Sequence, residues 1–317
     1  MTKILVIRML EMGDVASIAL PAIRYIKQAN PNAQLFCLTH GQGHELISLL
    51  EPDIQLLGLE NGNWPDNIFH GLEAFLGVAE SIVEIKFDQI INLDTAFMPC
   101  FLSRFLKDAG EPVQGNYIGL SLQELIDQIQ NQTLQPAYVN DVQQYMQSSF
   151  FSMFKWHTQW WQSDVLCDHG YPEFYLKNCC GFSDINYDAV LLPASVEFQK
   201  KSTKKIYLGL NDLQMPYLQT QTLVQELEQR GFIVEVDKEN APISSRLERL
   251  SASDLAVSLA NVVYALANTV GTPTLLVPIQ LDPRILMPDY ALDMASELPQ
   301  PEDLADSIAS IFEESAQ

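Results

Sequence analysis

The sequence predicts an α/β protein built from two doubly wound parallel sheets. Short β-branched apolar runs alternate with segments of helical periodicity in two stretches of the chain. This alternation is typical of parallel βαβ units with right-handed crossovers. The chain has 317 residues, of which 47% are hydrophobic, so it can form two domains with a core in each.

The first half begins with a buried strand at 3–9, followed by a turn at 11–14. Apolar residues from Val15 to Ile26 recur at spacings of three and four, which predicts a helix facing a sheet. Pro21 lies inside that pattern and predicts a kink. Further apolar runs predict strands at 34–39, 54–59 and 87–93 and a helix at 97–107.

The segment 120–182 is rich in glutamine and aromatic residues and has mixed periodicity, which favours core or domain packing over a ligand platform. The alternation then resumes, with strands at 204–210, 232–237, 254–259 and 273–279 and helices at 217–230 and 302–314. We therefore expect an N-terminal domain over 1–185, which includes the aromatic-rich segment, and a C-terminal domain over 204–317, which ends in a helix.

Composition excludes several classes of protein. Acidic residues number 40 against 18 basic ones, which argues against a nucleic-acid partner and against attachment to anionic lipid through basic residues. No apolar run is long enough to span a membrane and no signal peptide is recognisable, so we expect a cytoplasmic, acidic protein without stable membrane insertion. The five cysteines lack CxxC spacing, so neither a disulfide framework nor a metal site is expected.

Gly13 and Asp14 lie where the first strand turns into a helix. Ligands of doubly wound folds bind at this edge of the sheet, beyond the carboxyl ends of the strands. Asp14 has two interpretations: it caps the helix, as aspartate often does, or it serves as a general base that takes a proton from an attacking hydroxyl. The residue pattern leaves both open.

Several segments resemble the heptosyltransferase family, glycosyltransferase family nine. The family begins with a Lys-Ile-Leu strand, a Gly-Asp-Val turn and a helix with Leu-Pro-Ala, and here residues 3–5, 13–15 and 20–22 match. Residues 87–106 are similar to the region of its fourth strand, and Gly-Thr-Pro-Thr at 271–274 matches a turn in its second domain.

The resemblance implies the GT-B fold, in which two Rossmann-like domains face a central cleft. It implies inverting, metal-independent transfer of a heptose-type sugar from a nucleotide sugar, ADP-heptose, without a cofactor. The implied acceptor is lipopolysaccharide or another glycan, lipid-linked or free, at the cytoplasmic face of an inner membrane. By position, Asp14 is the base, and Gly13 and Glu11 lie on the acceptor side. The donor-side candidates are Asn211, Asn261, Gly271 and Thr272.

The sequence also departs from the family. The family's donor motif, Asp-(Thr/Ser)-Gly-x-x-His, is replaced by Ala260, Asn261, Val262 and Ala265, and the segment 209–218 holds no lysine. A catalytically inactive relative that binds a partner or acts as a scaffold is therefore an open alternative. An unrelated GT-B protein, such as a sugar-nucleotide epimerase, is a third. The basic residues at the domain boundary are interpreted as a solvated cluster: Lys200, Lys201, Lys204 and Lys205.

Overall fold

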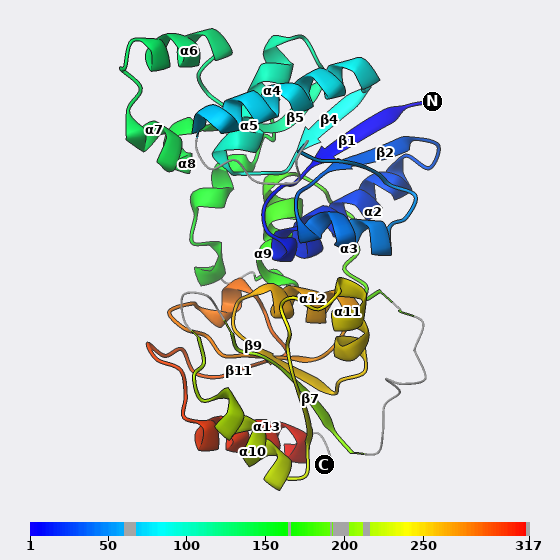
Figure 1. Cartoon of the computed structure of the whole chain (residues 1–317), viewed down its shortest axis with the longest axis vertical. Coiled ribbons are helices and arrows are strands. Elements are labelled where there is room, and N and C mark those ends of the chain that lie inside the picture. Colours follow the sequence, from blue (N-terminus) through cyan, green and yellow to red (C-terminus); the bar gives the residue numbers. More distant parts are fainter. Residues whose placement is uncertain (60–67, 164–165, 191, 193–202, 212–215, 315–317) are drawn as a thin grey trace. The chain divides into compact units, whose positions relative to one another are not determined.

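The computed structural model describes residues 1–59, 68–163, 166–190, 192, 203–211 and 216–314. The chain divides into two compact units (Figure 1). Unit 1 comprises Met1–Ser163 and Pro172–Asn186, and unit 2 comprises Asp164–Tyr171 and Tyr187–Gln317. The chain thus passes from one unit to the other after Ser163, after Tyr171 and after Asn186, whereas the sequence indicated one boundary between 185 and 204.

Unit 1 is built on a sheet with the strand order β3-β2-β1-β4-β5-β6, parallel except for β6, which runs antiparallel to β5. Its strands are β1 (Lys3–Ile7), β2 (Gln34–Leu38), β3 (Gln55–Leu57), β4 (Gln89–Asn92), β5 (Val113–Ile118) and β6 (Met146–Ser148). The first four confirm the strands predicted in this half. Its order 3-2-1-4-5 is that of a Rossmann fold, with the switch point between β1 and β4.

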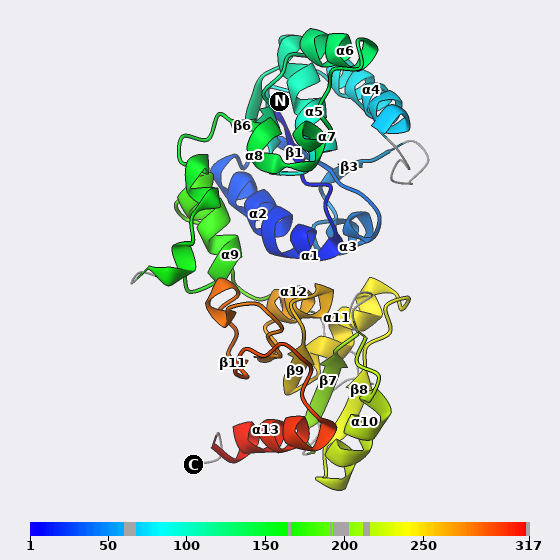
Figure 2. The same cartoon turned by 90° about the vertical axis from the view of Figure 1, so that its left-hand side faces the viewer.

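Helices cover both faces of this sheet: α2 and α3 lie on one face, and α4 and α5 on the other (Figures 1 and 2). They are α1 (Met12–Asp14), α2 (Leu20–Ala29), α3 (Gln42–Leu50), α4 (Ile68–Ile85), α5 (Phe97–Asp108), α6 (Leu122–Gln130), α7 (Pro136–Asn140) and α8 (Val142–Tyr145). Short helical segments follow at η2 (Met153–His157), η3 (Trp160–Gln162) and η4 (Phe174–Cys179), and α9 (Gly170–Glu173) begins in unit 2 and ends in unit 1. Helix α5 confirms the helix predicted at 97–107.

The first helix of unit 1 contains a π-helical turn, η1 (Val15–Ala19), between α1 and α2. The sequence predicted a kink at Pro21, because proline has no N–H to donate inside a helix. In the structure Pro21 lies in the first turn of α2, directly after the wider turn, where the Leu20 N–H bonds to the Val15 carbonyl. The irregular hydrogen bonding is therefore concentrated just after Asp14.

Unit 2 has a parallel sheet with the strand order β11-β10-β9-β7-β8. Its strands are β7 (Lys205–Gly209), β8 (Ile233–Val236), β9 (Leu255–Ser258), β10 (Thr274–Leu276) and β11 (Tyr290–Ala291). Its helices are α10 (Thr220–Gln229), α11 (Ile243–Ser251), α12 (Val262–Val270), the 3-10 turn η6 (Pro283–Ile285) and α13 (Pro301–Glu314). If the strands are renumbered from β7 as strand 1 and the sheet is followed from β8, the order is 2-1-3-4-5. This is a second doubly wound arrangement, with its switch point between β7 and β9.

Each unit has an apolar core of its own. In unit 1 the core includes Leu5, Phe75 and Ile90. In unit 2, α10 packs against α13, and the core includes Leu208, Leu227 and Ile308. Among the described residues, none of the helices combines the length and apolar character that crossing a bilayer requires.

Candidate functional site

Asp14 lies at the switch point of unit 1, just beyond the carboxyl end of β1. Its carboxylate does not cap a helix: the N-cap of α1 is Glu11, and Asp14 makes no side-chain cap bond to the turn that follows it. Its Oδ1 instead accepts a hydrogen bond from Arg8 Nη2 at 2.6 Å. The Asp14 side chain is 35% exposed while that of Arg8 is 1% exposed, so a buried guanidinium holds a carboxylate that solvent can reach. The capping interpretation of Asp14 is wrong.

Arg8 is held by groups from three segments of unit 1. Its Nη1 donates to the Leu93 carbonyl at 2.5 Å, and its guanidinium carbon lies 5.6 Å from the centre of the Tyr175 ring. The Tyr175 hydroxyl donates to the same Leu93 carbonyl at 2.8 Å. The partners of this buried cation therefore come from α1, from the loop after β4 and from η4.

A second carboxylate, that of the buried Asp94, follows β4 on the other side of the switch point. Its Oδ2 accepts from the Met9 backbone N–H, and its Oδ1 accepts from the N–H groups of Thr95 and Ala96. Burial raises the pKa of Asp94, and the nearby charge of Arg8 and the backbone donors oppose that rise. Asp94 thereby fixes the loop after β1 against the loop after β4.

Two buried asparagines complete this support. Asn92 Nδ2 donates to the Asn116 carbonyl at 2.7 Å, and Asn116 Nδ2 donates to the Asp94 carbonyl at 2.9 Å and to the Tyr175 hydroxyl at 3.0 Å. The network joins the ends of β4 and β5 to η4. Its effect is to hold Arg8, and through it Asp14, in one position.

The two acceptor-side candidates lie beside Asp14. Glu11 is exposed at the start of α1. Gly13 lies inside α1, and its carbonyl accepts a hydrogen bond from the Ser17 hydroxyl at 2.8 Å. The structure brings Glu11, Gly13 and Asp14 together in one turn; the roles of Glu11 and Gly13 toward an acceptor stay predictions.

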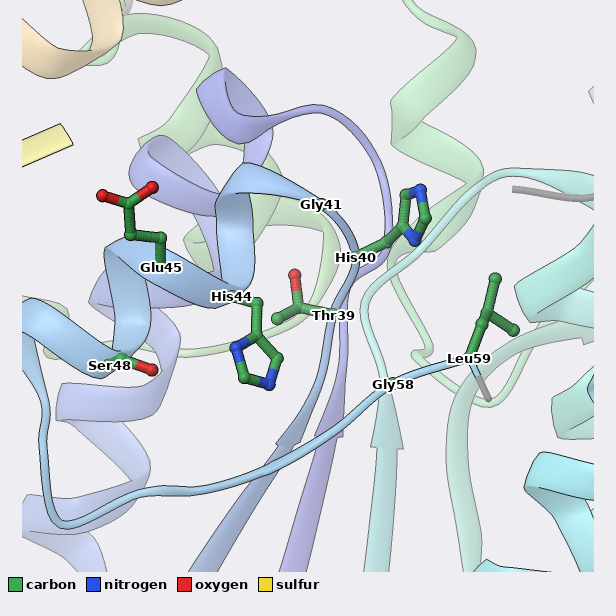
Figure 3. Close-up of a pocket in the computed structure, with 8 residues that line it drawn as sticks. All are labelled: Thr39, His40, Gly41, His44, Glu45, Ser48, Gly58 and Leu59. Atoms are coloured by element: carbon green, nitrogen blue, oxygen red, sulfur yellow. The ribbon is translucent and has the colours of Figure 1, made fainter. Parts of the chain in front are cut away.

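A pocket of about 650 Å³ opens at the same edge of unit 1, beyond the carboxyl ends of β2 and β3 (Figure 3). It is lined by Thr39, His40, Gly41, His44, Glu45, Ser48, Gly58 and Leu59. Partial burial lowers the pKa of His40, which favours the neutral imidazole. No motif predicts this pocket, because its polar residues are spread over a loop and one face of α3.

In unit 2, Asn211 and Asn261 follow β7 and β9, the two strands that flank the switch point. Asn261 Oδ1 accepts from the Val263 N–H and so caps α12. Its Nδ2 donates to the carbonyls of Gly209 and Asn211 at 2.8 Å and 3.3 Å. Asn211 itself is exposed. The structure therefore brings these two donor-side candidates together.

Gly271 and Thr272 lie at the other end of α12. Gly271 ends the helix with φ +70°, a conformation that glycine adopts readily, and the Thr272 hydroxyl is buried and donates to the Leu250 carbonyl at 2.7 Å. A helix of this length separates its ends by about 13 Å, at 1.5 Å per residue. A ligand group at Asn261 therefore does not also contact Thr272. The donor role of all four residues stays a prediction, and this geometry favours Asn211 and Asn261.

The basic residues near the domain boundary have local partners where the structure describes them. Lys204 pairs with Asp254 at 3.1 Å, and Lys205 pairs with Glu235 at 2.6 Å. Lys200 and Lys201 lie outside the described residues. Within the described part of the chain, no group of three or more His, Cys, Asp or Glu side chains is placed to hold a metal ion.

The sequence matches no protein-family model and no curated protein. The structure of the chain is nevertheless similar to solved structures of other proteins. A glycosyl transferase family 9 protein from Veillonella parvula aligns over 99% of this chain and 97% of its own, with a TM-score of 0.64 and 11% identity. The E. coli ADP-heptose LPS heptosyltransferase II aligns over 100% of both chains, with a TM-score of 0.62 and 12% identity. The chain has the GT-B fold.

The same fold serves other chemistry. A protein from Listeria monocytogenes described as a UDP-N-acetylglucosamine 2-epimerase aligns over 98% of this chain and 88% of its own, with a TM-score of 0.55 and 10% identity. Because a fold can host unrelated reactions, the function has to follow from the residues of the site. Sequence reasoning found Asp14 but missed Asp94 and Tyr175. The position of Asp94 directly after a predicted strand was the available signal for it.

Proposed function

We propose that the protein is an inverting, metal-independent glycosyltransferase that transfers a heptose-type sugar from a nucleoside diphosphate to a glycan hydroxyl. The observation that carries this proposal is the carboxylate of Asp14, open to solvent at the switch point of unit 1 and held by the buried guanidinium of Arg8. A general base needs this combination, because it must reach the substrate and still keep a fixed position.

In the proposed reaction, Asp14 takes the proton of the acceptor hydroxyl. The hydroxyl oxygen attacks the anomeric carbon from the face opposite the nucleotide and forms the new C–O bond. The bond between that carbon and the diphosphate oxygen breaks, and the nucleoside diphosphate leaves with the electron pair. Because Arg8 engages Oδ1 of Asp14, the other carboxylate oxygen is the one that receives the proton.

The switch point of unit 2 supports a donor site. The N-terminus of α12 begins there, and the amide groups and dipole of a helix N-terminus favour a diphosphate and the negative charge that develops on it as it leaves. Asn211, exposed beside this terminus, is a candidate to contact the nucleotide sugar. ADP-heptose is the first donor to examine, since the E. coli structure of similar fold is an ADP-heptose enzyme.

The proposal is tested in two steps. A thermal-shift screen with ADP-heptose, ADP, UDP-sugars and GDP-sugars should raise the melting temperature with one of them, because a ligand that binds only the folded state stabilises it. With that donor, Asp14→Asn should lower kcat by about 10²- to 10⁴-fold, the usual contribution of a general base, and leave the donor Kd unchanged.

Asp127→Asn is the matched control, since Asp127 is an exposed carboxylate on α6 of the same unit. It should leave both kcat and Kd as in the wild type. If no nucleotide sugar binds the folded protein, the proposal is wrong and the catalytically inactive relative is the better account.

A further inference from the structure

The pocket of unit 1 is fixed next to the turn that carries Asp14. Helix α3, which forms one wall, packs against α1 and η1. The contact is close: a Cβ atom at Gly43 would lie 2.7 Å from both Thr39 Oγ1 and Val15 Cγ2. The pocket and the proposed base therefore lie at the same edge of the sheet, on elements that pack against each other.

The lining of the pocket suits sugar hydroxyl groups. His40 and His44 project on two sides of Thr39, and Glu45 and Ser48 follow along α3 (Figure 3). These side chains include both donors and acceptors, as hydroxyl recognition requires. The buried Thr39 hydroxyl has no hydrogen-bond partner among the described residues, and Figure 3 shows it directed toward the first turn of α3.

Carboxylates outnumber lysine and arginine side chains at this edge of unit 1. In the described residues up to eight positions past the ends of β1, β2, β3 and β4, the carboxylates are Glu11, Asp14, Glu45 and Asp94. Arg8 is the one lysine or arginine in those segments, and its guanidinium is engaged by Asp14 and the Leu93 carbonyl. The sequence itself contains no lysine or arginine between Lys27 and Lys86, a stretch that includes the whole pocket.

A site of this composition disfavours an anion. A phosphate or carboxylate group there would lose part of its hydration and approach carboxylates, with no cation in the same stretch of sequence to compensate. We propose that the pocket binds a sugar of the acceptor, and that the acceptor is an uncharged glycan where it meets unit 1, not a phosphorylated or carboxylated one. The assignment of the bound sugar to the acceptor rests on the proposed function; the preference for an uncharged sugar does not.

The test measures binding of matched sugars to the full-length wild-type chain without a donor, so that no turnover occurs and Asp14 keeps its charge. The probes are glucose, galactose and mannose and the 6-phosphate of each. Saturation-transfer NMR measures their binding. At least one neutral sugar should bind, and its 6-phosphate should bind at least about fivefold more weakly at low salt. The difference in affinity between the neutral sugar and its 6-phosphate should narrow in 0.5 M NaCl, where the screening length is about 4 Å, because added salt screens the repulsion.

Two variants test whether residues of the pocket cause these differences in sugar affinity. His44→Ala should weaken binding of the neutral sugar, since His44 is an exposed side chain of the lining. Glu45→Gln should strengthen binding of the 6-phosphate more than that of the neutral sugar. Glu80→Gln, an exposed site on α4, is the control that should change neither.

Equal or tighter binding of the 6-phosphates overturns the inference, as does the absence of binding by every neutral sugar. Neutral-sugar binding in a protein that turns over no nucleotide sugar supports the pocket and contradicts the proposed function, so the two failures are distinguishable.

Discussion

Replacing Arg8 with methionine should destabilise unit 1 by about 3 kcal/mol. The change removes a charge-assisted hydrogen bond to the Leu93 carbonyl, which contributes about 1.5–3 kcal/mol. It also removes the ion pair with Asp14, which adds at most about 1 kcal/mol because the Asp14 carboxylate is partly exposed to water. Methionine fills much of the space of the arginine stem, so the cavity contribution is small.

Urea unfolding followed by tryptophan fluorescence measures this loss in the right unit. All four tryptophans of the sequence fall between Met1 and Ser163, so the signal reports unit 1. Arg8→Lys keeps the positive charge but has one nitrogen in place of the two that bond to Leu93 and Asp14. It should therefore lose less stability than Arg8→Met.

Lys177→Met is the control. Lys177 is exposed in unit 1 and pairs with Glu173 four residues earlier, and an ion pair of this kind contributes about 0.3–0.5 kcal/mol. If Arg8→Met unfolds at the same urea concentration as Lys177→Met, Arg8 does not hold the site together and the reasoning about Asp14 fails with it.

Two further predictions concern packing and pH. Gly43→Ala should destabilise unit 1 by about 1–3 kcal/mol, because the added methyl group would clash with Thr39 and Val15. Gly77→Ala on α4 places its methyl group in open space and should stabilise the unit by up to about 1 kcal/mol. The urea midpoints of the two variants, compared with the wild type, test both expectations. Burial works to raise the pKa of Glu235, but its bonds to Lys205 and Arg249 outweigh burial and lower it. Glu235 therefore stabilises the folded state above its unfolded pKa and loses that contribution as pH falls through its folded pKa. Calorimetry between pH 7 and pH 3 should show a smaller loss of stability for Glu235→Gln than for the wild type, and an equal loss would contradict the assignment.

The elements that the sequence predicted are those whose burial shows in local pattern. Strand β1 has neighbours on both sides and shows an unbroken apolar run at 4–7, and β4, which also has two neighbours, has the apolar pair Ile90 and Ile91 at its centre. Asp14 could be predicted because the Gly-Asp pair follows the first of these runs, where a doubly wound fold places its site. The donor-side asparagines could be located at their strand ends for the same reason.

The missed elements depend on partners far away in the chain. Strand β5 contains Gln114, Gly115 and Asn116, which do not resemble a buried strand. Asn116 is nevertheless fully buried, and its side-chain nitrogen donates hydrogen bonds to the Asp94 carbonyl and the Tyr175 hydroxyl. No local pattern shows such a bond. The same holds for Arg8, a charged residue whose partners come from Asp14, Leu93 and Tyr175.

The passage of the chain out of unit 1 and back again has a consequence for how the protein is made. Arg8 and Asp94 leave the ribosome early, but Tyr175, whose ring lies over the Arg8 guanidinium, follows only after residues that belong to unit 2. At 5–20 residues per second, roughly 4–16 s of synthesis separates Asp94 from Tyr175. A nascent chain that ends at Ser163 has every strand of the first sheet and still lacks the ring that covers its buried cation. The proposed catalytic base therefore reaches its final setting only after more than half of the chain has been synthesised.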